Sequence, residues 1–150
     1  MDRAAGMEIL VVAEEGAKLP RFATPNAAGA DLCAFLLGGA MVLQPKSFAL
    51  IPTGLTMEIP VGFEGQVRPR SGLAAKFGVT VLNAPGTIDS DYRGEVKIIL
   101  INHGDKAFTI NHGDRIAQLV ICATQNCRFI QTNSISLTER GERGFGSTGV

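Results

Sequence analysis

Short apolar segments, separated by turn-forming residues, constrain the fold of this chain more than any other feature. Runs of this length at intervals of about 8–12 residues are typical of an all-β sandwich or barrel. The many glycines agree with this prediction, because tight turns often need the positive φ that glycine adopts easily. The segments are Ile9–Val12, Phe48–Ile51, Gly54–Ile59, Gly65–Val67, Val79–Leu82, Val96–Ile101, Ala107–Ile110 and Ile116–Cys122.

The length of 150 residues fits one domain, which at this size buries roughly 70% of the surface that the unfolded chain exposes. No stretch has the composition of a linker that would divide it. We therefore expect a disordered leader over residues 1–6, a β domain over residues 7–137 and a flexible, glycine-rich tail over residues 138–150. Met7 is an alternative start, because strand-like residues begin only at Ile9.

The charges balance, with 14 basic and 14 acidic residues. A chain without a net field has no general attraction for nucleic acid or for an anionic membrane, so we expect neither as a partner. The N-terminus lacks the apolar stretch of a signal peptide, and no apolar run approaches the roughly 20 residues that cross a bilayer.

The cysteines and histidines lack the spacing of a metal site. Cys122 and Cys127 are not arranged as a close zinc or redox pair, and with Cys33 they make an odd number. We therefore expect free thiols and a cytoplasmic location. The tetrapeptide Asn-His-Gly-Asp occurs at 102–105 and again at 111–114. Its histidines are either a metal pair or, as the neighbouring Gly and Asp favour, parts of two similar turns.

Residues 71–77 have the pattern of a short helix. Ser71 is a suitable N-cap, good helix formers follow it, and Gly78 can end the helix. The free N–H groups at the helix start, with Arg68 and Arg70 just before it, would suit a phosphate. A solvated basic turn is the alternative.

Residues 84–95 concentrate reactive side chains on one tight turn. Asp89, Asp91 and Tyr92, the only tyrosine, lie between Pro-Gly and Arg-Gly turn formers. A carboxylate held on such a turn can orient a water molecule, and a nearby aromatic ring can pack against a ligand. An ordinary β-turn is the alternative, because Asp, Ser and Gly are common turn residues.

The glycines of residues 140–150 argue against a packed element, so a disordered end is one interpretation. The other is a flap that closes over a ligand, with arginines on phosphate, hydroxyls as donors and a ring stacked on a flat base. Such stacking is worth roughly 1–3 kcal/mol per base. The side chains concerned are Arg140, Arg143, Phe145, Ser147 and Thr148.

Taken together, these segments resemble the homotrimeric dUTP diphosphatases (dUTPases). All five motifs of that family can be matched in order, from about Met7 to the end of the chain. One match alone would be weak, but five in order at sensible spacings are strong evidence. The matches are Ala28–Leu32, Pro69–Ala74, Gly86–Gly94, Gly113–Leu119 and Arg140–Gly149.

The resemblance implies an all-β, jelly-roll-like β-barrel with one short helix and a flexible C-terminal tail. It implies a homotrimer whose active sites are shared between subunits, with the tail reaching over a neighbour's site. The implied reaction is Mg²⁺-dependent hydrolysis of dUTP to dUMP and pyrophosphate. Such an enzyme limits uracil incorporation into DNA and supplies dUMP for thymidylate synthesis.

The resemblance also implies roles for single residues. Asp89 would activate the water that attacks the α-phosphorus, and Tyr92 would pack on the deoxyribose and refuse ribonucleotides. The segment from Asn83 to Asp89, with Thr87 and Ile88, would read uracil, and Lys97 would border the substrate. Asp31 would act on Mg²⁺ through water. The residues implied for the phosphates and for stacking are Arg70, Ser71, Gly72, Gln118, Arg140, Ser147, Thr148 and Phe145.

Two positions depart from the family pattern, because Ala30 replaces a common tyrosine and Arg143 stands where a small residue is usual. Neither removes a residue of the implied chemistry. The rival interpretations are a dCTP deaminase of the same fold and a regulatory trimer that binds nucleotide without hydrolysing it. The sequence Thr87–Tyr92 fits the diphosphatase version of the turn, and retention of Asp89 argues against a pure binder.

Overall fold

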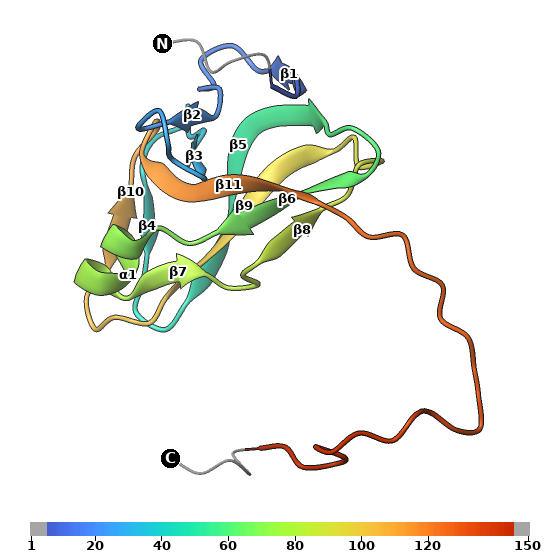
Figure 1. Cartoon of the computed structure of the whole chain (residues 1–150). Coiled ribbons are helices and arrows are strands. Elements are labelled where there is room, and N and C mark those ends of the chain that lie inside the picture. The colour runs from blue at the N-terminus through green and yellow to red at the C-terminus, as the bar shows by residue number, and fades with distance from the viewer. Residues whose placement is uncertain (1–5, 146–150) are drawn as a thin grey trace.

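Strands form three antiparallel sheets in the computed structural model, which describes residues 6–145 (Figure 1). A four-stranded sheet has the order β1 (Leu10–Ala13), β5 (Phe48–Glu58), β9 (Glu95–Asn102), β7 (Val79–Val81). A five-stranded sheet has the order β2 (Arg21–Phe22), β3 (Ala30–Cys33), β11 (Arg115–Ala123), β6 (Phe63–Arg68), β8 (Gly86–Ile88). The third sheet pairs β10 (Phe108–Ile110) with β4 (Met41–Leu43).

The core is built from residues that alternate along the strands. On β9, Val96, Ile98 and Leu100 are buried while Lys97 between them is exposed. Leu32 of β3 and Leu119 of β11 belong to the same apolar cluster. Because successive side chains of a strand point to opposite faces, one face of β9 packs in the core and the other is free to line a site.

The mostly β architecture with one short helix confirms the predicted fold class at that level. The sheets do not close into a barrel within residues 6–145. Two predicted segments, Phe48–Ile51 and Gly54–Ile59, form the single strand β5, which is interrupted by a bulge between Pro52 and Thr56. The short strands not predicted as such are β2, β3, β4 and β8.

The helix α1 (Ser71–Phe77) has the predicted bounds but a different N-cap. Arg70 occupies the N-cap position in extended conformation and Ser71 is the first helical residue, so the prediction that Ser71 caps the helix is wrong. Gly78 ends the helix as predicted, with a φ of 67°. A side chain there would also meet the backbone N of Gly104 at 2.8 Å, so only glycine fits.

The repeated tetrapeptides form the turns on either side of β10, between β9 and β11. In the first, the buried side chain of Asn102 donates to the carbonyls of Leu43 and Lys106 and accepts from the N–H of Gly104. In the second, His112 Nδ1 accepts the N–H of Leu36 at 3.1 Å. This structural use of the repeat favours the two-turn interpretation over a histidine metal pair.

After β11 the chain leaves the sheets and runs as an extended, exposed segment up to residue 145 (Figure 1). Phe129 and Leu137 on this segment are almost fully exposed. The domain boundary predicted at residue 137 stays a prediction. Among the described residues, no helix has both the length and the apolar composition needed to cross a membrane.

Candidate active site

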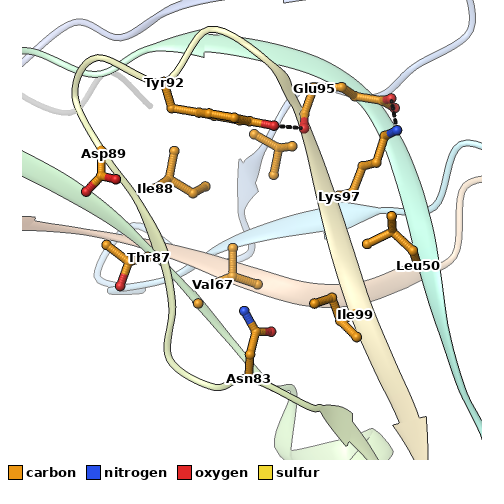
Figure 2. Close-up of a pocket in the computed structure, with 12 residues that line it drawn as sticks. Leu50, Val67, Asn83, Thr87, Ile88, Asp89, Tyr92, Glu95, Lys97 and Ile99 are labelled. Atoms are coloured by element: carbon orange, nitrogen blue, oxygen red, sulfur yellow. Dashed lines mark hydrogen bonds and ion pairs between the residues drawn. The ribbon is translucent and has the colours of Figure 1, made fainter.

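A cavity of about 300 Å³ lies beside the turn that joins β8 to β9 (Figure 2). Strand β8 pairs with β6, which places Gly86 opposite Val67, and β9 forms the other wall. Six residues predicted for substrate binding or catalysis line this one cavity: Asn83, Thr87, Ile88, Asp89, Tyr92 and Lys97. The structure therefore brings together the residues of the third motif with Asn83 and Lys97.

The turn that carries Asp89 is held by its own backbone and by an arginine. The N–H of Tyr92 donates to the Asp89 carbonyl at 3.1 Å. The guanidinium of Arg93 donates to the carbonyls of Ser90 and Tyr92 at 2.7 and 3.1 Å. The Asp89 carboxylate forms no hydrogen bond or ion pair within residues 6–145, and its side chain is exposed. A rigid turn thus presents a carboxylate that is free to accept from a water molecule.

Tyr92 is held at the hydroxyl end of its ring. Its hydroxyl donates to the Glu95 carbonyl at 2.9 Å, as Figure 2 shows. The ring lies over Gly94, where an added Cβ would collide with the Tyr92 hydroxyl and ring carbons. The side chain remains 46% exposed, so one side of the ring is available to a ligand. This arrangement suits a flat or puckered ring packed against the tyrosine.

A second group of predicted residues gathers where β3, β11 and β6 lie side by side. Gln118 is opposite Asp31 on one side and Arg68 on the other, and its side chain donates to the Pro69 carbonyl at 2.9 Å. Any side chain at Gly29 would collide with the Gln118 amide. The sheet register therefore joins residues of the first, second and fourth motifs.

Asp31 lies between two arginines in this second group. Its Oδ1 is 3.2 Å from Arg70 Nε, and its Oδ2 is 3.3 Å from Arg115 Nη1. Arg70 Nη1 also donates to the Arg115 carbonyl at 3.0 Å. The Asp31 side chain is only 17% exposed, so the pairs are partly shielded from water. Ser71 and Gly72 follow Arg70 at the start of α1. Arg68 makes no ion pair with Asp31, and its guanidinium donates to the Gln66 side chain on the same strand.

The two groups do not line one cavity in the single chain, because the residues around Asp89 and those around Asp31 belong to separate surfaces. The predicted tail residues join neither group. Arg140 makes local hydrogen bonds with Arg143, and Phe145 is fully exposed. Ser147 and Thr148 lie outside the described residues.

Sequence reasoning missed two residues of these groups. Glu95 is the last residue of the segment 84–95 and has no predicted role. Its backbone carbonyl nevertheless accepts a hydrogen bond from the Tyr92 hydroxyl, and the residue lines the cavity. Arg115 lies inside the matched motif Gly113–Leu119 and pairs with Asp31. The segment 84–95 and the matched motif Gly113–Leu119 marked these two positions in the sequence, but only the fold shows which neighbour each residue contacts.

Asp31 is predicted to act on Mg²⁺ through water, and its surroundings fit that indirect role. Both carboxylate oxygens face guanidinium groups, so a directly bound metal would lie beside two positive charges. Each oxygen has a second lone pair that can accept from a metal-bound water. Mg²⁺ usually keeps several waters and takes phosphate oxygens as ligands. Within residues 6–145 no group of three or more His, Cys, Asp or Glu could hold the ion directly.

A larger cavity of about 610 Å³ is lined by Asp31 together with Cys33, Lys18, Arg21 and Arg115. Burial raises the pKa of the Cys33 thiol above its ordinary value, although the charge of Lys18 opposes the shift. None of the three cysteines is in a disulfide, as the sequence predicts. Cys33 is therefore mainly a neutral thiol at neutral pH.

Comparison with known proteins identifies the family. The dUTPase family model matches residues 15–149. A deoxyuridine 5'-triphosphate nucleotidohydrolase from Treponema pallidum subsp. pallidum is 53% identical over 144 residues, covering 96% of this chain and 99% of that protein. One from Beijerinckia indica subsp. indica is 59% identical over 136 residues, covering 90% of this chain and 85% of that protein.

A solved structure agrees with the sequence matches. The Staphylococcus bacteriophage 80alpha dUTPase with dUpNHpp has a TM-score of 0.86 at 28% identity, covering 95% of this chain and 99% of that one. Both the family model and the relatives span most of the chain, so the chain belongs to the dUTPase family.

Proposed function

We propose that this chain hydrolyses dUTP to dUMP and pyrophosphate, by attack of a water molecule that Asp89 aligns with the α-phosphorus. The observation that carries the proposal is the cavity beside the β8–β9 turn, which places Asp89, Tyr92 and Asn83 around one space. A volume of about 300 Å³ is at the lower end of the range for small-molecule sites. It suits a nucleoside whose phosphates extend outside.

Asp89 serves as the general base in this proposal. Its unpaired, exposed carboxylate on a braced turn can accept a proton from water as the oxygen bonds to phosphorus. General-base assistance of this kind typically contributes about 10²–10⁴-fold to the rate. The leaving group is pyrophosphate, whose charge the phosphate-binding residues stabilise as the bond to the α-phosphorus breaks.

The walls of the cavity account for selectivity. Tyr92 packs on the deoxyribose, where a 2′-hydroxyl would clash with the fixed ring, so ribonucleotides are refused. Asn83, Thr87 and Ile88 read the uracil, largely through backbone groups, and a pocket tight around C5 rejects thymine. Steric exclusion is needed because an extra methyl group otherwise changes binding by only about 1–3 kcal/mol.

The residues around Asp31 bind the phosphates. Arg70, Ser71 and Gly72 hold the α- and β-phosphates together with Gln118, and Asp31 keeps the Arg70 guanidinium in place. Because this group is separate from the Asp89 cavity within one chain, a homotrimer of jelly-roll-like subunits would complete each site from neighbouring copies. The tail would close it with Arg140, Ser147 and Thr148 on the γ-phosphate and Phe145 over the base.

Magnesium belongs to the proposal as a partner of the phosphates. When bound, it would neutralise phosphate charge and favour departure of pyrophosphate, with Asp31 holding one of its waters. The free cysteines support the cytoplasm as the site of the reaction. There the product would supply thymidylate synthesis, and removal of dUTP would limit uracil incorporation into DNA.

A pyrophosphate-release assay with dUTP and the four standard deoxynucleoside triphosphates, in the presence of Mg²⁺, tests the proposal. We expect rapid release from dUTP and release at least a hundredfold slower from the other four. Ammonia from dCTP would identify a deaminase instead, and nucleotide binding without any product would identify a regulatory protein. Either of these results contradicts the proposed function.

A further inference from the structure

Glu95 makes three contacts in the wall of the candidate active site. Its backbone carbonyl accepts a hydrogen bond from the Tyr92 hydroxyl at 2.9 Å. Its carboxylate accepts the N–H of Gly54 through Oε1 at 2.9 Å and lies 3.6 Å from Lys97 Nζ through Oε2. Figure 2 shows Glu95 between the tyrosine hydroxyl and the lysine ammonium. One residue thus contacts both side chains that we expect to border the nucleoside.

The contact with Gly54 ties Glu95 to an irregularity of the neighbouring strand. On β9, Lys97 pairs with Pro52 of β5, but Glu95 pairs with Thr56, so β5 bulges between these two positions. The bulge itself is tightly built, because the buried Thr53 hydroxyl donates to the Val96 carbonyl and Gly54 adopts a φ of 68°. Because of the bulge, the N–H of Gly54 does not pair with the backbone of β9, and it donates to the Glu95 carboxylate instead.

Strand geometry explains why Lys97 is within reach. Glu95 and Lys97 are two residues apart on β9 and therefore point to the same face, the one that lines the cavity. A lysine side chain has several rotatable bonds and many accessible rotamers in water. Pairing with a carboxylate that is itself anchored to β5 restricts the ammonium to one part of the cavity wall.

We propose that Glu95 is a positioning residue, whose carboxylate fixes Lys97 before the nucleotide binds. The inference rests on the proposed function for the identity of the substrate. Ordering flexible side chains in advance lowers the entropic cost of binding. The benefit therefore falls on substrate binding, and the chemical step at Asp89 is largely unaffected.

Steady-state kinetics of Glu95→Gln, Lys97→Met and the double variant test the proposal. Glutamine can still accept the Gly54 N–H but loses the charge that holds Lys97, so the fold is retained. We expect Glu95→Gln to raise KM for dUTP about threefold to fivefold, with kcat within twofold of wild type. In the Lys97→Met background the same substitution should leave KM unchanged, because the side chain through which it acts is gone.

Asp105→Asn is the matched control, since it breaks an exposed ion pair of 3.7 Å with Lys46 that does not line the cavity. It should leave KM and kcat unchanged. Equal KM values for Glu95→Gln and wild type, or the same increase with and without Lys97, would overturn the proposal. If Glu95→Gln does not fold, Lys97→Met alone decides, because an unchanged KM in that variant also contradicts the proposal.

The assay separates this inference from the proposed function. A wild-type protein that releases no pyrophosphate from dUTP would contradict the proposed function itself. A wild-type protein that is active, together with a Glu95→Gln variant of unchanged KM, would contradict only the role of Glu95.

Discussion

The carboxylate of Asp31 and the guanidinium of Arg70 form an ion pair at 3.2 Å, which joins the first matched motif to the second. The pair is positioned by sheet register, because β11 lies between β3 and β6 and brings their ends together. Arg115 on the central strand adds the second contact to Asp31. The proposed phosphate-binding arginine is therefore held in place before any phosphate arrives.

Replacing Asp31 with alanine is expected to destabilise the fold. Removal of the carboxylate leaves Arg70 and Arg115 close together without their shared partner. For a partly shielded pair of contacts we expect a loss of about 1–3 kcal/mol in the free energy of unfolding, between the values for exposed and buried ion pairs. Urea denaturation measures the change, with Asp105→Ala as the exposed control that should cost under about 0.5 kcal/mol. Equal stability of the Asp31 variant and wild type would show that the pairs do not hold this region together.

Replacing Asp89 with asparagine should abolish turnover while leaving nucleotide binding largely intact. The amide has nearly the shape of the carboxylate but cannot take a proton from water. We expect kcat to fall about 10²–10⁴-fold. Calorimetry with a non-hydrolysable dUTP analogue should give an affinity within a few-fold of wild type. A variant that keeps a kcat near that of wild type would mean that another group activates the water.

Much of this site could be predicted from the sequence because its residues lie in short local motifs. Turn chemistry at 84–95 and the helix bounds Ser71–Phe77 depend on neighbouring residues, and both elements occur where they were expected. The prediction of Ser71 as the N-cap is wrong, because Arg70 keeps an extended conformation after β6 and Ser71 becomes the first residue of the helix. Serine favours a cap only when the preceding chain allows it.

The missed features depend on contacts between distant segments. Strand β3 is short and lies in a stretch rich in alanine and glycine, and it is stabilised by pairing with β11, more than eighty residues away. The roles of Arg115 and Glu95 likewise come from partners on other strands, Asp31 and Gly54. The pattern of residues within one segment does not show which residue of a distant strand lies opposite it.

Gly94→Ala should weaken substrate binding by displacing Tyr92. The new methyl group would collide with the tyrosine ring, although the backbone at this position needs no positive φ. We expect KM for dUTP to rise about tenfold, a change of about 1.4 kcal/mol. Gly38→Ala is the control, since an added Cβ there meets nothing within 4 Å. Wild-type kinetics for the Gly94 variant would show that the ring is not held in the position that binding requires.

Cys33 should react more slowly than Cys127 with iodoacetamide at pH 7.5. Burial raises the pKa of the Cys33 thiol, so a smaller fraction is thiolate, the reactive form, at this pH. Cys127 is exposed on the extended segment. Mass spectrometry of the alkylated peptides gives both rates, and the Cys33 rate should rise as the pH is raised above 7.5. Equal rates for the two cysteines at pH 7.5 would contradict the raised pKa of the Cys33 thiol.

The central claim is that a water molecule next to Asp89 attacks the α-phosphorus of dUTP. Hydrolysis in water enriched in oxygen-18, followed by mass spectrometry of both products, tests it directly, because the attacked phosphorus keeps the oxygen of the water. The account predicts the heavy isotope in dUMP and none in pyrophosphate after a single turnover. Heavy oxygen in pyrophosphate would place the attack at the β-phosphorus and contradict it.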